Sequence, residues 1–146
     1  MKIKEIRKFS TSVYDAVVRL LPQLDNDLKP PDKAYFKQVV TSGNTHFIIG
    51  EDDDRKIIGF LAIVVYIVPT GTKVWIEDVV VDEASRGKGY GTDLMLYAID
   101  YAKSLGAKHV DLTSRPWRIA ANHLYQKLGF VLRETNVYRY YLGEQS

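Results

Sequence analysis

The feature that most constrains the fold is the glycine-rich stretch RGKGYGT at residues 86–92. Residues 73–82 before it are rich in valine and predict a buried strand. The residues after it predict a helix that ends near Gly106. Because glycine weakens both strands and helices, its concentration at this turn indicates that bare backbone is needed there. The apolar stripe of the predicted helix consists of Tyr90, Leu94, Ala98, Tyr101, Ala102 and Leu105.

The remaining periodicities predict a mixed sheet with helices on its faces, in the α/β class. Apolar spacing and turn residues favour the order β-α-α-β-β-β-α-β-α-β-β within one domain over residues 1–146. The β-α-β segment at 74–114 implies two parallel neighbouring strands, whereas the earlier hairpins imply antiparallel pairing. Further strands are expected at 2–9, 45–51, 56–68, 108–114 and, as a pair, 130–142, and helices at 12–24, 31–40 and 118–128.

Composition excludes several kinds of site and partner. The chain has no cysteine, which rules out disulfides, thiolate metal ligands and a cysteine nucleophile. His46, His109 and His123 have no metal-binding spacing, so we expect no metal. A net charge of +2 is too small to indicate nucleic acid as the main partner.

No membrane segment is expected either. The longest apolar run, residues 57–68, is too short to cross a bilayer, which takes about 20 residues. The first ten residues lack the apolar core of a signal peptide. We therefore expect a cytoplasmic location and no membrane partner.

The position of the glycines suggests an anion site. A helix begins with unpaired backbone N–H groups and a partial positive charge, and without Cβ atoms an anion can approach this backbone closely. Arg86 and Lys88 could add charge, and Thr92 could add a hydroxyl group. A turn that only starts a helix is the alternative.

Two common phosphate-binding patterns do not fit the stretch. The dinucleotide pattern requires glycine where Thr92 or Leu94 stands. The nucleotide P-loop requires a glycine at position 82 and a serine or threonine at position 89, which hold Asp82 and Gly89.

A third pattern matches in two places. Arg-x-x-Gly-x-Gly, formed by Arg86, Gly89 and Gly91, resembles the acyl-CoA diphosphate loop of the GNAT acyltransferase superfamily. AANHLYQKLGF at 120–130 resembles the second signature of that family. The likeness covers nearly the whole chain and is strongest from about 74 to 130, with both motifs in the family's order and separation.

The resemblance implies a fold in which two central parallel strands splay apart and hold the pantetheine of acetyl-CoA between them. It implies that the backbone of Val79, Val80 and Val81 meets the pantetheine. It further implies that Asn122 and Tyr125 meet the cofactor. By the same analogy, the diphosphate would be held by Arg86, Gly87, Lys88, Gly89, Tyr90, Gly91 and Thr92.

Tyr125 is the candidate acid that protonates the departing thiolate, because its place in LYQKLGF matches the tyrosine of the family. A proton donor helps here because a thiol has a pKa of about 8.5. The alternative is an aromatic side chain that only packs on a buried helix face.

Glu77 is the candidate base, directly or through water, because it interrupts an otherwise apolar strand. Strict alternation places it on the face of Val79 and Val81, with Asp78 on the other face. A bulge would break this alternation, so Asp78 remains a second candidate. Either carboxylate could instead be structural and paired with Arg115 or Lys108.

These observations predict an N-acetyltransferase in which an amine attacks acetyl-CoA directly in a ternary complex. The alternatives are a non-catalytic acyl-CoA-binding module on the same fold and a protein acetyltransferase with a peptide amine as acceptor. Asp25, Asp27 and Asp32, between the first two helices, would suit a cationic amine, or form a solvated loop. A homodimer is implied only by analogy with the family.

Overall fold

The computed structural model describes residues 1–143 and divides into two compact units, Met1–Arg115 and Pro116–Ser146. The expectation of a single domain over residues 1–146 stays a prediction.

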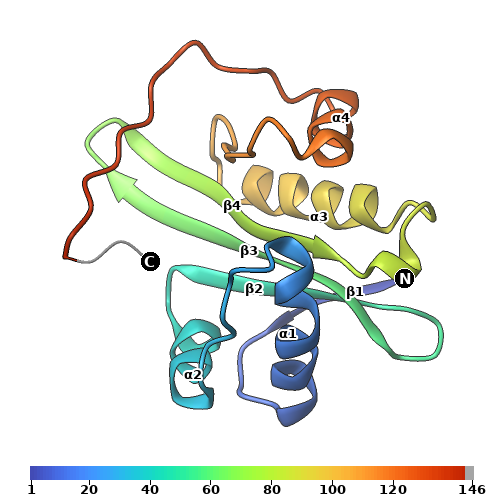
Figure 1. Cartoon of the computed structure of the whole chain (residues 1–146). Coiled ribbons are helices and arrows are strands. Elements are labelled where there is room, and N and C mark those ends of the chain that lie inside the picture. The colour runs from blue at the N-terminus through green and yellow to red at the C-terminus, as the bar shows by residue number, and fades with distance from the viewer. Residues whose placement is uncertain (144–146) are drawn as a thin grey trace. The chain divides into compact units, whose positions relative to one another are not determined.

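The first unit is an antiparallel sheet with helices on both faces (Figure 1). The strands follow the order β1-β2-β3-β4, so that β1 and β4 are the edges. Helices α1 and α2 lie on one face, and α3 lies on the other. This confirms the mixed α/β class. The elements are β1 (Lys2–Ile6), α1 (Thr11–Leu24), α2 (Lys33–Thr41), β2 (Thr45–Glu51), β3 (Ile57–Val68), β4 (Gly71–Val81), a 3-10 turn (Glu83–Ser85) and α3 (Tyr90–Ser104).

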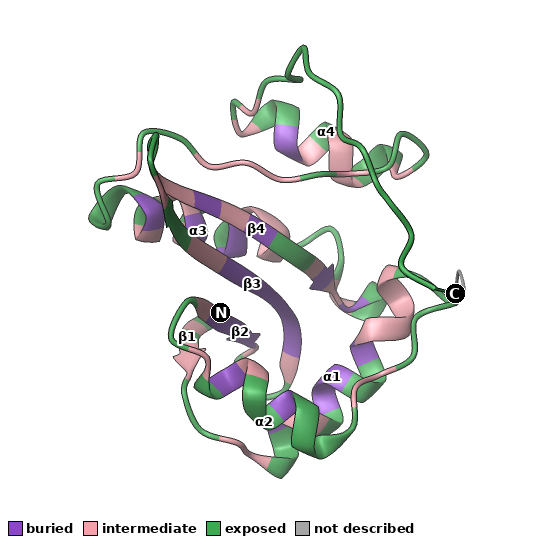
Figure 2. Cartoon of the chain, turned by 90° about the vertical axis from the view of Figure 1, so that its left-hand side faces the viewer, coloured by how far each residue is buried: buried purple, intermediate pink, exposed green. Residues whose placement is uncertain are grey.

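The main core lies between the sheet and the first two helices. Phe36 of α2 packs edge-on against Phe47 of β2, with ring centroids 5.3 Å apart. Figure 2 shows the buried residues of this unit along its strands and on its helices. The helix expected at 12–24 is confirmed as α1, which buries Val13, Ala16, Val17 and Leu20. The buried members of this core are Val13, Val17, Leu20, Phe36, Val40, Phe47, Ile49, Phe60 and Val80.

The opposite face of the sheet is covered by α3, which buries Leu94, Met95, Ala98 and Ala102. The helix comes very close to the sheet at Gly59. A Cβ atom there would lie 2.8 Å from the Val80 carbonyl oxygen and 3.0 Å from Leu94 Cδ1. This close packing anchors the first turns of α3 over β3 and β4.

The second unit contains α4 (Ile119–Lys127), which matches the helix expected at 118–128. Its buried residue is Tyr125, whose ring packs edge-on against Phe130 at 6.0 Å. The chain turns back after the helix at Gly129, where φ is +101°, and the Phe130 amide donates to the Tyr125 carbonyl over 2.9 Å.

The last three expected strands differ from the structure. Residues 108–114 form a single parallel bridge, at Asp111, in place of a strand. Residues 130–142 contain no strand, although they are rich in the β-branched and aromatic residues that strands favour. A strand requires a neighbour that takes up its hydrogen bonds, and within the second unit the described residues contain no other strand.

Candidate active site

The centre of the candidate site is a bulge in β4. Glu77 lies opposite Ala62 and Val80 lies opposite Phe60, so two residues of β4 stand against Leu61 alone. Asp78, the first of the two, has φ of +53°. Such a conformation is uncommon for a residue other than glycine, though aspartate tolerates it better than most. Bulges of this kind often redirect a side chain next to an active site.

Because of the bulge, the side chains of β4 do not alternate between the two faces of the sheet as the sequence predicted. Glu77 and Val80 lie on the same face of the sheet, the face that packs on α1 and α2, since Val80 and Phe60 belong to that core. Val81 pairs with Gly59 and faces the other side. The expectation that Glu77 shares a face with Val79 and Val81 is therefore wrong, because one extra residue reverses the parity.

In the part of the chain that the structure describes, the outer edge of β4, on the side away from β3, loses its hydrogen-bonding partner just before the bulge. The Ile76 amide donates to the Asp111 carbonyl over 2.9 Å, and the Asp111 amide donates to the Val74 carbonyl over 3.0 Å. Beyond this bridge, β4 pairs with β3 alone within residues 1–143. The stretch 77–81, which includes Val79, Val80 and Val81, thus presents one edge to which an extended ligand could add.

The glycine loop follows directly and opens α3. Gly87 and Gly89 have φ of +80° and +82°, and no atom lies within 4 Å of a Cβ atom built at either position. The first helical hydrogen bond runs from the Asp93 amide to the Gly89 carbonyl, over 3.1 Å. Within the described chain, none of the amides of residues 87–92 has a hydrogen-bond acceptor. These amides form a concentrated set of donors at a helix N-terminus, which suits an anion.

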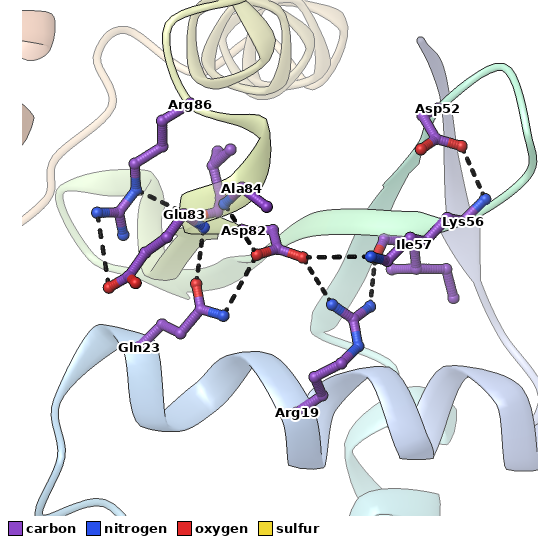
Figure 3. A network of polar contacts seen from close by, with 10 residues as sticks. Arg19, Gln23, Asp52, Lys56, Ile57, Asp82, Glu83, Ala84 and Arg86 are labelled. Carbon is purple, nitrogen blue, oxygen red and sulfur yellow. Dashed lines mark hydrogen bonds and ion pairs between the residues drawn. The ribbon is translucent and has the colours of Figure 1, made fainter.

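The charged side chains of the loop are arranged differently from the expectation. Arg86 Nε donates to the Val81 carbonyl over 3.2 Å, and its guanidinium lies 4.0 Å from Glu83 (Figure 3). The Arg86 side chain therefore contacts the end of β4 in this structure. Lys88 is exposed, and Thr92 is half-buried in the first turn of α3.

The two carboxyl groups at the bulge are both harder to ionise than usual. Partial burial raises the pKa of Glu77 above its ordinary value of 4.5, and the charge of Asp78 adds to this shift. Partial burial also raises the pKa of Asp78. Both side chains are nevertheless exposed at the surface of β4. A raised pKa in an accessible carboxylate suits a proton-accepting role.

An aromatic pair that was not expected from the sequence lies on the Glu77 face. Trp75 is two residues before Glu77, and its indole N–H donates to the Tyr66 hydroxyl over 2.9 Å. The register of β3 and β4 places Trp75 opposite Val64. Sequence reasoning missed this pair because the two rings are brought together only by the hairpin register.

The second unit carries the other two candidates, one helical turn apart on α4. Tyr125 is 6% exposed. Burial raises the pKa of its hydroxyl group, although the Arg118 charge opposes the shift. Asn122 Nδ2 donates to the Arg118 carbonyl over 2.8 Å. The roles of Tyr125 and Asn122 stay predictions.

A buried carboxylate next to the loop was also missed. Asp82 is 6% exposed and stands between β4 and the 3-10 turn, where its Oδ1 accepts from the Ala84 amide over 3.2 Å. An aspartate just after a strand and two residues before a turn amide is a capping signal that the sequence does show. Its ion pair with Arg19 of α1 has no signal in the sequence.

Along residues 1–143, histidine, aspartate and glutamate side chains do not gather in groups of three that could hold a metal ion. None of the helices in that range combines the length and apolar character needed to cross a membrane.

Comparison with known proteins places this geometry in a family. Residues 11–130 match the acetyltransferase (GNAT) family. Streptothricin acetyltransferase of Streptomyces lavendulae is 36% identical over 86 residues, which are 59% of this chain and 43% of that protein. Thialysine N-epsilon-acetyltransferase of Mus musculus is 31% identical over 81 residues, which are 55% of this chain and 48% of that protein. The matches thus span less than half the length of these two relatives.

A solved structure shows the same fold over almost the whole chain. It is an aminoglycoside acetyltransferase from an uncultured soil metagenomic sample, in complex with sisomicin. The TM-score is 0.85 and the identity is 18%, with 98% of this chain and 96% of that chain covered. At this identity the likeness concerns the fold alone. The family match covers most of the sequence, and the chain therefore belongs to the acetyltransferase (GNAT) family.

Proposed function

We propose that the protein transfers an acetyl group from acetyl-CoA to a primary amine, by direct attack of the amine in a ternary complex. One observation supports this most. In the first unit, the amides of residues 87–92 lack acceptors and follow directly on the open edge of β4 at 77–81. The free amides would bind a diphosphate, and the neighbouring strand edge would pair with an extended chain attached to it.

The residues fit acetyl-CoA in two ways. The amides of Gly87 to Thr92 would hold the diphosphate, because free N–H groups at a helix start donate to phosphate oxygens. The backbone of Val79, Val80 and Val81 would pair with the pantetheine as a neighbouring strand does. When bound, acetyl-CoA supplies an activated acetyl thioester.

The side chains and backbone of the chain would supply the remaining chemistry. Glu77 takes a proton from the amine, whose pKa is about 10.4 for a lysine-like group, so that the nitrogen can attack. Backbone amides at the bulge stabilise the negative charge that develops on the carbonyl oxygen. Tyr125 donates its hydroxyl proton to the departing sulfur. Its assignment depends on its place in the second motif and on its raised pKa, which keeps the hydroxyl protonated.

Substitution Glu77→Gln is expected to lower kcat/KM about a hundredfold, which is the usual range for loss of a general base. Coenzyme A affinity should stay close to that of the parent, since the side chain is not part of the loop. Steady-state kinetics and calorimetry measure the two effects. Glu134→Gln, which removes an exposed carboxylate in the second unit, is the matched control. A normal rate in Glu77→Gln, with loss of rate in Asp78→Asn, would assign the base to Asp78.

The same substitution has an expected effect on stability. The raised pKa means that folding disfavours the ionised form of Glu77, so this residue reduces stability once the pH exceeds its ordinary value of 4.5. Glu77→Gln should therefore unfold at a slightly higher temperature than the parent at pH 7, and at the same temperature near pH 3. A lower unfolding temperature at pH 7 would show that the ionised carboxylate is stabilising.

The acceptor is proposed to be a small cationic amine. Carboxylates at the bulge and the Trp75 and Tyr66 rings provide charge and aromatic surface for such a group. Of the three aspartates after α1, Asp32 caps α2 by accepting from the Tyr35 amide, and Asp25 accepts from the Asp27 amide. Asp27 is therefore the member whose carboxylate is proposed to meet the amine. Relatives named for streptothricin and thialysine support this class.

A panel of amines at fixed acetyl-CoA, with thiol release as the signal, tests the function. It should contain an aminoglycoside, a lysine analogue, a polyamine and a lysine-containing peptide. We expect thiol release with at least one small cationic amine and a slower reaction with the peptide. Tight coenzyme A binding without thiol release from any amine would favour the non-catalytic module, and a preference for the peptide would favour a protein acetyltransferase.

A further inference from the structure

The buried carboxylate before the glycine loop is held from three sides. Asp82 Oδ2 accepts from Arg19 Nη1 over 2.7 Å, and Lys56 Nζ lies 3.9 Å from the same oxygen. Asp82 Oδ1 accepts from the Ala84 amide over 3.2 Å and from Gln23 Nε2 over 3.4 Å. Figure 3 shows Asp82 at the centre of this network, between α1 and the turn.

Helix α1 supplies two residues to the network, one helical turn apart. Besides binding Asp82, Arg19 donates to the Ile57 carbonyl at the start of β3 over 2.6 Å. Gln23 uses both ends of its amide, since its Oε1 accepts from the Glu83 amide over 2.9 Å. The two side chains thus connect α1 to β3, to the end of β4 and to the first turn of the loop.

The charges in this network are satisfied. Burial by itself would raise the pKa of Asp82, but hydrogen bonds from Ala84, Gln23 and Arg19, together with the Arg19 charge, outweigh it and lower the pKa. The carboxylate therefore stays ionised at neutral pH. Removing Arg19 would leave a buried charge short of its main partner, which is costly.

The network ends where the free amides begin. The Ser85 amide donates to the Asp82 carbonyl over 2.8 Å, and the Arg86 amide donates to the Glu83 carbonyl over 3.3 Å. Gly87 follows at once. The contacts of Asp82 and Glu83 with α1 therefore set the direction in which the chain enters the stretch 87–92.

We propose that Arg19 and Gln23 are positioning residues for the cofactor loop: by holding Asp82 and the Glu83 amide, they preorganise the amides of residues 87–92 and so set the affinity for coenzyme A. The inference rests on the proposed function, because it assigns these amides to the diphosphate. Preorganised donors bind an anion without the cost of ordering the loop.

The test uses the full chain with Arg19→Met, which keeps the aliphatic stem and removes the charge. Calorimetry with coenzyme A and steady-state kinetics with acetyl-CoA give Kd, KM and kcat. We expect Kd and KM to rise about tenfold, as loss of a hydrogen bond to a charged group implies. The value of kcat should change little, because the network does not touch the reacting atoms. A destabilised but correctly positioned loop would not produce this split between KM and kcat.

Three further variants sharpen the result. Lys37→Met removes an exposed cation on α2 and should leave Kd unchanged. Arg19→Lys keeps the charge and should recover part of the affinity. Gln23→Leu removes the bond to the Glu83 amide and should weaken binding less than Arg19→Met, and it serves as the test if Arg19→Met does not fold.

Hydrogen exchange of the ligand-free protein separates this inference from the proposed function. The amides of Glu83, Ala84 and Ser85 have acceptors in the network and should exchange faster in Arg19→Met, while those in the middle of α3 should not change. A folded Arg19→Met with unchanged exchange and unchanged Kd overturns the inference. A parent protein that does not bind coenzyme A overturns the proposed function, and exchange then decides whether Arg19 positions the loop.

Discussion

Replacing Gly89 with valine is expected to weaken coenzyme A binding about a hundredfold, the cost of losing two charge-assisted hydrogen bonds. Gly89 caps α3 with φ of +82°, and the space around its missing Cβ is open within 4 Å. The proposed diphosphate would occupy this space. A branched side chain would fill it and keep phosphate oxygens away from the amides. Calorimetric titration with coenzyme A measures the effect.

The chain offers a matched control at the other end of the same helix. Gly106 also has a left-handed backbone, with φ of +73°, and also has no atom within 4 Å of a built Cβ. Gly106→Val should therefore lose a similar amount of stability from backbone strain, but bind coenzyme A normally. If both variants are folded and bind coenzyme A equally well, the loop is not the diphosphate site.

Tyr125→Phe is expected to lower kcat between about a hundredfold and a thousandfold, as for loss of a general acid. Coenzyme A affinity should stay nearly intact, because the ring that packs against Phe130 is kept. The pKa of the Tyr125 hydroxyl is raised by burial, so the group remains a proton donor in alkaline solution. The alkaline limb of the parent pH–rate profile should accordingly lie above pH 10 or be set by another group.

The control for this prediction is Tyr140→Phe, which removes a hydroxyl from a residue that is 88% exposed in the same unit. It should leave both kcat and Kd unchanged. A Tyr125→Phe variant with full turnover would return Tyr125 to a purely structural role. In that case, the thiolate must leave without this proton donor.

Local patterns in the sequence were sufficient for most elements of the first unit. The apolar spacing of α1 and the cap at Asp32 depend on neighbours within one or two helical turns, so both can be recognised from the residues alone. The glycine loop was recognisable because Gly87 and Gly89 take backbone conformations that other residues avoid.

What the sequence could not indicate depends on distant partners. The bulge at Asp78 arises from the register of two strands, and it changed the face on which Glu77 lies. Arg19 and Asp82 are 63 positions apart, and no periodic pattern connects them. Residues 130–142 have the β-branched and aromatic composition of a strand, yet strand formation requires a partner as well as a suitable composition.

A crystal structure of the protein grown with coenzyme A tests the central claim most directly. The account predicts diphosphate oxygens within hydrogen-bond distance of the amides of residues 87–92, with the pantetheine running along β4 at residues 77–81. Coenzyme A bound elsewhere on the chain, or a loop whose amides are occupied by a side chain of the protein, would contradict it.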